Sequence, residues 1–153
     1  VMYDGRVVQM GTPVELFETP EHTFVGYFIG SPGMNLLDAQ IDGNTAHVNG
    51  HAVPLGAAYE VRGGKMQIGV RPEFVSLTSE ATGLPVTVRR VEDVGRHKIV
   101  RADLFGAEIN ILVDEGRAIS ADDTRVVFDA AKVNVYENDW RVAPSAGSVG
   151  AAQ

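Results

Sequence analysis

Lysine and histidine residues beside glycines are the first candidates for chemistry in this sequence of 153 residues. A phosphate loop needs a longer glycine-rich run that ends in Gly-Lys-Ser or Gly-Lys-Thr and leads into a helix. Gly63-Gly64-Lys65 is too short and Met66 follows it, so we interpret it as a hairpin turn. His47 and His51 flank a predicted turn at Asn49-Gly50 and could approach each other, but no third ligand stands nearby. We therefore expect no nucleotide site and no metal site.

Paired carboxylates are the next candidates, because general acid–base catalysis often uses two of them. Such catalysis needs a carboxylate in a water-poor pocket that shifts its pKa. The pairs stand at predicted strand ends or in loops beside Gly or Ser, where we expect them to be solvated: Glu92-Asp93, Asp114-Glu115 and Asp122-Asp123. No serine stands in the strand-to-helix elbow of a hydrolase nucleophile. The sequence therefore predicts no catalytic residue.

Arg89-Arg90 and Arg96-His97-Lys98 form the only basic cluster. Barrels that bind single strands of nucleic acid place aromatic platforms beside a basic groove, but here the neighbours are Val, Asp and Gly. The net charge of -7 also repels phosphate backbones. We interpret the cluster as a solvent-facing hairpin that balances nearby acids, and we expect no nucleic-acid partner.

The segment Gly69-Val70-Arg71-Pro72-Glu73 places two opposite charges at a corner where an apolar strand ends. Pro72 fixes its own φ angle and pushes Arg71 to an extended conformation. One interpretation is an Arg–Glu pair that braces the corner. The other is a contact with a second subunit or a partner protein.

The first thirty residues predict a hairpin followed by two helices. Apolar residues flank Asp4-Gly5, which favours a tight turn between short strands within Val1 to Met10. Thr12-Pro13-Val14-Glu15 is a capping box, so we expect a helix through Phe17 or Glu18. Thr19-Pro20-Glu21 repeats the start signal and predicts a second helix that runs to Ile29.

The stretch FIGSPGMNLL, residues 28–37, separates two kinds of sequence pattern. Before it, Phe24, Val25, Phe28 and Ile29 have the spacing of one helical face. Gly30 is placed as a C′ cap and Pro32 cannot continue the helix. After it, short β-branched and apolar runs alternate with turns, which predicts strands close to the following bounds: 35–41, 45–48, 52–55, 66–70, 75–78, 84–94, 98–104, 107–113, 125–128 and 132–136. These strands are typical of a small Greek-key barrel or sandwich.

Composition fits a soluble globular protein, with 44% hydrophobic and 22% charged residues. No apolar run is long enough to span a bilayer, and the N-terminus lacks the apolar core of a signal peptide. The absence of cysteine excludes disulfides and fits a reducing compartment. Because position 1 is Val, we expect a fragment or a processed product. We expect the tail, residues 143–153, to be disordered, because it lacks apolar residues that could pack.

Taken in order, these motifs resemble the C-terminal portion of the ATPase subunits of ABC importers for maltose, multiple sugars and glycerol-3-phosphate. Each motif is weak alone, but the ordered set is specific and covers most of residues 1–142. The motifs are the hairpin Val1 to Met10, Gly11-Thr12-Pro13 with Glu15-Leu16, Pro20, Phe24-Val25, Phe28-Ile29-Gly30-Ser31-Pro32 with Met34-Asn35, and Gly69-Val70-Arg71-Pro72-Glu73.

The resemblance implies a mainly β fold with three parts. Residues 1–31 would be the C-terminal remnant of the nucleotide-binding domain, with its hairpin and two helices. Residues 32–142 would be an OB-fold-like (TOBE) β-barrel regulatory domain, and residues 143–153 a disordered tail. The phosphate loop, signature motif and switch histidine of the family are missing here. We therefore expect no ATP or Mg²⁺ site and no enzyme activity in this chain, whereas the longer parent would hydrolyse ATP.

The resemblance also implies the partners. These would be a second copy of the subunit, the nucleotide-binding domain of its own chain, membrane permease subunits at the inner face of the cell membrane, and a regulatory protein in some relatives. The residues predicted to make partner contacts are Arg71, Pro72, Glu73 and Asn35. The alternative is a small module that binds an oxyanion such as molybdate through turn amides and a nearby Arg or Lys. Calorimetry with molybdate, sulfate, phosphate and glycerol-3-phosphate would separate the two.

Overall fold

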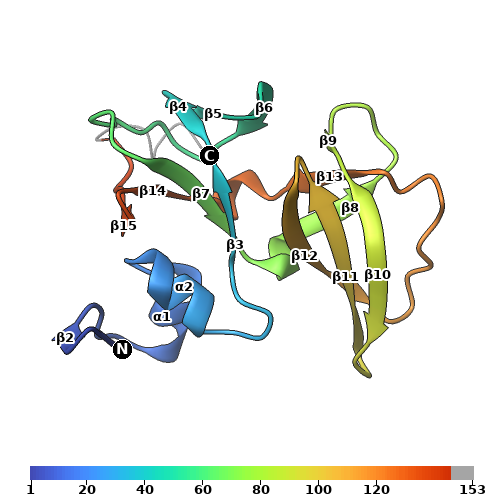
Figure 1. Ribbon diagram of the computed structural model, residues 1–153, viewed down its shortest axis with the longest axis horizontal. Coiled ribbons are helices and arrows are strands. Elements are labelled where there is room, and N and C mark those ends of the chain that lie inside the picture. The colour runs from blue at the N-terminus through green and yellow to red at the C-terminus, as the bar shows by residue number, and fades with distance from the viewer. Residues whose placement is uncertain (146–153) are drawn as a thin grey trace. The chain divides into compact units, whose positions relative to one another are not determined.

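The computed structural model describes residues 1–145, and it consists mainly of antiparallel β-strands with two short α-helices (Figure 1). The mainly β class and the two helices confirm the prediction. The described residues form two compact units, one of Val1–Val70 with residues 130–145 and one of Arg71–Asp129. The division into three parts, residues 1–31, 32–142 and 143–153, stays a prediction. Most of the third part, residues 146–153, lies outside the described residues.

The first unit begins with the predicted hairpin of β1 (Met2–Tyr3) and β2 (Arg6–Val7). Asp4 and Gly5 connect them with φ angles of 50° and 73°, as a primed turn requires. The capping box of α1 (Pro13–Glu18) is also confirmed, because Thr12 and Glu15 form both of the reciprocal hydrogen bonds that define it. The N–H of Thr12 donates to the Glu15 carboxylate at 2.9 Å, and Thr12 Oγ1 accepts from Glu15 N–H at 3.2 Å.

Helix α2 (Thr23–Phe28) begins three residues later than predicted, because its N-cap is His22 and not Thr19. Thr19 does not start it, because the backbone N–H and hydroxyl of Thr19 both donate to Glu15 O and so end α1. His22 is the N-cap instead, and its ring Nδ1 accepts a backbone N–H of the first turn at 3.0 Å. Gly30 follows the helix with a φ of 108°, which fits its predicted place as C′ cap.

The predicted apolar face of this helix divides between core and surface. Phe24 and Phe28 stack with ring centroids 5.6 Å apart, but Phe28 is 65% exposed. Val25 is fully buried, and Gly26 beside it is buried as well. The side of α2 that enters the core is therefore centred on Val25 and Gly26 rather than on the phenylalanines.

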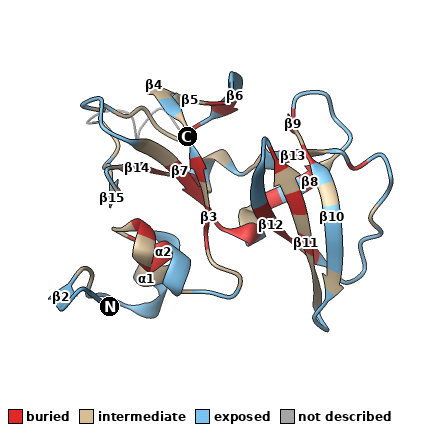
Figure 2. Ribbon diagram, viewed as in Figure 1, coloured by how far each residue is buried: buried red, intermediate tan, exposed pale blue. Residues whose placement is uncertain are grey.

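Two further sheets complete the first unit (Figures 1 and 2). The larger has the strand order β15-β14-β7-β3 and carries fully buried side chains, among them Ile68, Val135 and Tyr136. The smaller is a meander of β4, β5 and β6. The bounds are β3 (Asn35–Asp38), β4 (Gln40–Asp42), β5 (Thr45–Val48), β6 (His51–Pro54), β7 (Met66–Val70), the 3-10 turn η2 (Ala130–Lys132), β14 (Asn134–Glu137) and β15 (Trp140–Arg141).

The second unit contains two three-stranded sheets, β8-β13-β9 and β10-β11-β12. Its core shows a period of two, since Ile109, Ile111 and Val113 of β12 are buried and the residues between them are not. The bounds are the 3-10 turn η1 (Pro72–Phe74), β8 (Val75–Thr78), β9 (Leu84–Pro85), β10 (Thr87–Asp93), β11 (His97–Leu104), β12 (Ala107–Asp114) and β13 (Arg125–Phe128).

The sheets do not join into one closed barrel, although a barrel was one of the two arrangements that the strand pattern favoured. The strands between residues 1 and 145 form five open sheets of two to four strands. Two predicted strands are interrupted, one at Ala39 and one at Val86, where the backbone N–H donates to Met66 O and to Thr124 O respectively. Each interruption ends one pairing and starts another, so the strands are shorter than a single closed sheet would need.

Candidate functional site

The corner after β7 has the backbone that its sequence predicts. Arg71 is extended, with φ -69° and ψ 147°, and Pro72 takes the first position of η1. The N–H of Phe74 donates to Arg71 O at 2.9 Å and closes the turn. Arg71 is only 3% exposed and Pro72 is buried, whereas Glu73 is exposed. The two charges of the corner therefore lie in different environments.

Asn35, the fourth predicted contact residue, belongs to the first unit. It lies at the start of β3, opposite Val70 of β7, and is 5% exposed. Of the four predicted contact residues, Glu73 is thus the one with an exposed side chain. A partner contact made by this set stays a prediction.

The histidines do not form the pair that we considered. His47 lies opposite Ala52, and His51 lies opposite Val48, in the hairpin of β5 and β6. Because successive side chains of a strand point to opposite faces, His47 and His51 lie on opposite faces of this hairpin. Within residues 1–145, no three His, Asp or Glu side chains gather in an arrangement that could hold a metal ion.

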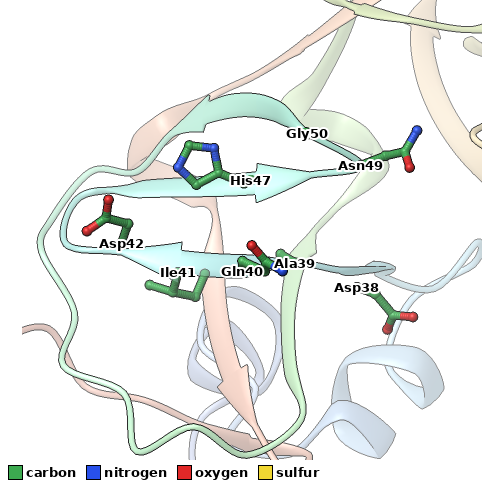
Figure 3. Close-up of a pocket in the computed structure, with 8 residues that line it drawn as sticks. All are labelled: Asp38, Ala39, Gln40, Ile41, Asp42, His47, Asn49 and Gly50. Atoms are coloured by element: carbon green, nitrogen blue, oxygen red, sulfur yellow. The ribbon is translucent and has the colours of Figure 1, made fainter.

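An open hollow of about 810 Å³ lies beside β4 and β5 and is lined mainly by polar residues (Figure 3). Figure 3 shows Asp38 and Asn49 pointing outward near one end of these strands, with Asp42 near the other. Asp38 also accepts a hydrogen bond from the Gln67 amide at 3.3 Å. The polar side chains do not converge on one point, so the hollow does not supply the clustered donors that an oxyanion needs.

A set of long-range polar contacts in the first unit joins the N-terminal segment, residues 1–29, to strands β14 and β15 and the turn between them. We call this contact the joint. Tyr136 of β14 is fully buried, and its hydroxyl donates to Pro20 O at 2.7 Å, across 116 residues of sequence. The same hydroxyl lies 3.7 Å from Met34 Sδ. A buried hydroxyl is costly unless it is bonded, so this contact fixes the segment on the sheet.

Close packing reinforces the joint around Tyr136. A Cβ atom added at Gly69 would lie 2.7 Å from Met34 Sδ and 2.8 Å from Tyr136 Cε2. A Cβ added at Gly26 would overlap the Met34 methyl group and lie 3.3 Å from Pro20 Cγ. Both glycines thus make room for the Met34 side chain, which packs between Gly26 of α2 and Gly69 of β7.

Polar contacts extend the joint along β15. The Arg141 guanidinium donates to Glu21 Oε1 at 2.8 and 3.0 Å, and the Arg141 N–H donates to Glu21 O at 2.8 Å. Thr23 donates its N–H to Asp139 O at 2.9 Å and its hydroxyl to Asp139 Oδ1 at 3.1 Å. The His22 ring meets Trp140 edge-on, with centroids 4.7 Å apart. The sequence predicted the N-terminal helices and the strand at 132–136, but it predicted neither β15 nor the pairing of these elements.

The second unit carries a different kind of polar cluster, on one face of the β10-β11-β12 sheet. Arg101 of β11 donates to Glu92 at 3.2 and 3.3 Å, to Glu108 at 3.3 Å and to Asn110 at 2.9 Å. The hydrogen bond to Glu92 is the main cause that raises the pKa of the Arg101 guanidinium above its ordinary value. Arg90 adds an ion pair with Glu92 at 2.9 Å. Arg90 is thus one member of the predicted basic cluster that pairs with a nearby acid, whereas Arg101, the centre of these contacts, was not part of that cluster.

Comparison with known proteins connects this fold to transporters. Residues 30–75 match the family model of the MalK OB fold domain. The chain is 46% identical over 100 residues to the sn-glycerol-3-phosphate import ATP-binding protein UgpC of Salmonella paratyphi A, which covers 62% of this chain and 28% of that relative. It is 35% identical over 119 residues to UgpC 2 of Agrobacterium fabrum, which covers 75% of this chain and 32% of that relative.

The same protein of Escherichia coli O157:H7 is 42% identical over 100 residues, covering 62% of this chain and 28% of the relative. The chain thus spans about three tenths of the length of the curated relatives that it matches. Among the described residues, no helix is long and apolar enough to cross a membrane.

Proposed function

Because the chain resembles the C-terminal, OB-fold-bearing portion of the ATP-binding subunits of sugar and glycerol-3-phosphate importers, we propose that it is their regulatory and dimerisation part and performs no catalysis itself. In this proposal the longer subunit binds ATP and Mg²⁺ through residues that this sequence does not contain. The longer subunit hydrolyses ATP at the inner face of the membrane, where permease subunits hold it. The chain contributes association with a second copy and a mechanical connection.

The observation that carries the proposal is the joint. The N-terminal segment, which resembles the end of a nucleotide-binding domain, makes a buried hydrogen bond and a two-bond ion pair with β14 and β15. A contact with few voids transmits displacement, because close-packed side chains resist compression. Movement of the nucleotide-binding domain would therefore carry the whole first unit with it.

Transport assays of the full-length subunit, assembled with its permease, test this connection. Glu21→Arg and Arg141→Glu each place two like charges across the joint, whereas the double variant restores an opposite pair. We expect each single variant to lower solute uptake per ATP hydrolysed and the double variant to recover much of it. Lys65→Ala, an exposed residue of the same unit, is the control and should leave the ratio unchanged. Wild-type ratios in both single variants would contradict the proposal.

Association is tested on the chain itself by sedimentation equilibrium. We expect a mass that rises with protein concentration toward that of two copies. A strictly monomeric species at high concentration would contradict the dimerisation role while leaving the mechanical connection open to the transport assay.

A further inference from the structure

Strand β10 is an edge strand, and its free edge is the surface of interest in the second unit. It pairs with β11, and no other strand of residues 1–145 pairs with it. The N–H of Val94 donates to His97 O at 3.0 Å and closes the β10–β11 hairpin. Because bonded and non-bonded pairs alternate in antiparallel sheets, Glu92 directs its backbone groups toward β11, while Val91 and Asp93 direct theirs outward. These outward groups can form a ladder with another strand.

The charges along this strand would match those of a second copy of the same strand that runs in the opposite direction. The sequence from Val88 to Val94 is V-R-R-V-E-D-V, with Val91 at its centre. If two copies run antiparallel about a two-fold axis at Val91, Arg90 lies opposite Glu92 of the second copy and Arg89 lies opposite Asp93. Valines lie opposite each other at the centre and at both ends. A parallel arrangement would instead place like charges side by side, which is unfavourable.

The residues that would make these contacts are accessible. Arg89, Arg90, Val91 and Asp93 are exposed, and Val91 is 45% exposed although valine usually occupies buried strand positions. The Glu92 carboxylate is already held by Arg101 at 3.2 Å, which fixes it on the sheet face beside the edge. The Arg90 side chain is 63% exposed, so its ion pair with Glu92 can be shared with a second copy at little cost.

We propose that the free edge of β10 pairs with the β10 edge of a second copy, antiparallel about a two-fold axis at Val91, to give a continuous six-stranded sheet. The inference rests on the proposed dimerisation role and names the surface that performs it. The register of β10 shifts between Val88 and Arg90, at Arg89. Such irregularities and charged side chains limit which other strands can pair with a sheet edge. Because the positive charges lie in the first half of the segment and the negative charges in the second, most other strand edges are disfavoured as partners, whereas a strand of the same sequence is favoured.

Two charge-reversal variants of β10, measured separately and then mixed, test the proposal. The variant Arg89→Glu/Arg90→Glu has an all-acidic edge, and Glu92→Arg/Asp93→Arg has an all-basic edge. We expect self-association of each, measured by sedimentation equilibrium, to weaken at least tenfold relative to the natural chain. An equimolar mixture of the two should form a heterodimer at least as tight as the natural homodimer. Unfolding curves of each variant show whether it is folded.

Disulfide trapping gives a second readout that does not depend on Glu92. Because the chain has no cysteine, Val91→Cys introduces a single thiol at the two-fold axis. Opposed Cα atoms in an antiparallel pair lie within the span that a disulfide allows. We expect Val91→Cys to form a covalent dimer under mild oxidation much faster than Val127→Cys, a control on β13 of the same unit with 37% exposure.

The outcomes separate the inference from the proposed function. A natural chain that dimerises, together with charge variants that dimerise equally well or equal trapping at positions 91 and 127, would overturn the β10 pairing and leave the dimerisation role standing. A natural chain that is monomeric at every concentration would overturn both. The pairing would be established by three results together. Each charge variant alone associates weakly, their mixture associates as the natural chain does, and disulfide trapping is selective for position 91.

Discussion

The joint of the first unit and the β10-β11-β12 sheet of the second unit are both polar clusters, but their partners lie at different distances along the chain. Tyr136 reaches Pro20 across 116 residues, whereas Arg101 reaches Glu92 across 9. Tyr136 is fully buried, and the Arg101 side chain is 26% exposed. The comparison indicates that Tyr136 stabilises the joint mainly through packing and an obligatory buried bond, while Arg101 stabilises the sheet through charges that water screens.

The largest expected effect follows from removing the ring at the centre of the joint. Tyr136→Ala leaves a cavity among Pro20, Met34 and Gly69, and a buried aromatic replaced by alanine costs about 3–5 kcal/mol. Urea unfolding should therefore show a loss of this size in the free energy of unfolding. Tyr136→Phe keeps the ring but loses the hydrogen bond to Pro20, so it should cost about 1 kcal/mol. Equal losses in both variants would contradict the assignment to packing.

The next effect comes from adding an atom to the joint instead of removing one. Gly69→Ala places a methyl group against Met34 and Tyr136, and overpacking of a tight core costs about 1–3 kcal/mol. Gly116→Ala is the matched control, since a methyl group there meets no atom within 4 Å. Thermal unfolding should show a lower Tm for the first variant and an unchanged Tm for the second. An unchanged Tm in Gly69→Ala would mean that the joint is loosely packed.

A smaller effect is expected in the charged sheet. Arg101→Ala removes the hydrogen bonds to Glu92, Glu108 and Asn110, and partly exposed pairs contribute about 1 kcal/mol or less. The loss should shrink in about 1 M salt, where the Debye length is about 3 Å. Arg90→Ala is the control, because its more exposed pair with Glu92 should contribute almost nothing. If the loss in the free energy of unfolding in Arg101→Ala did not depend on salt, Arg101 would stabilise its sheet as Tyr136 stabilises the joint, and the contrast would be wrong.

The smallest effect should appear only at high pH. Burial raises the pKa of Tyr59 in the first unit above its ordinary value, and the nearby Arg141 opposes this in part. A raised pKa means that the folded state holds the phenol proton more tightly. The free energy of unfolding should thus be unaffected below about pH 10, the ordinary tyrosine value, and should fall as the pH rises through the folded pKa. Tyr59→Phe should flatten this fall, and an unchanged slope in that variant would assign it to other groups.

The same contrast explains how much of the fold could be predicted from the sequence. Signals that act within a few residues were read correctly, such as the Asp4-Gly5 turn and the capping box from Thr12 to Glu15. Four predicted strands, among them Met66–Val70 and Arg125–Phe128, have the predicted bounds. The hairpin that leads into β15 was missed, although Asn138 and Asp139, with φ angles of 50° and 73°, are residue types that tolerate this conformation.

The joint could not have been predicted in this way. Nothing local to Pro20 or Glu21 indicates that Tyr136 and Arg141 are their partners, because the pairing depends on the course of the chain between them. The burial of Arg71 is a similar case. Its place before Pro72 fixed its backbone, but its exposure of 3% depends on surroundings that its own sequence neighbourhood does not specify.

Native-state hydrogen exchange of the Thr23 and Arg141 amides tests the central claim, that the N-terminal segment and strand β15 form one mechanical body. These amides donate to Asp139 O and Glu21 O, so each reports the joint from one side. The account predicts that both exchange with the same opening free energy, far above that of a frayed end, and that Tyr136→Ala lowers both together. Rapid exchange at Thr23 with slow exchange at Arg141, or different responses to that substitution, would contradict it.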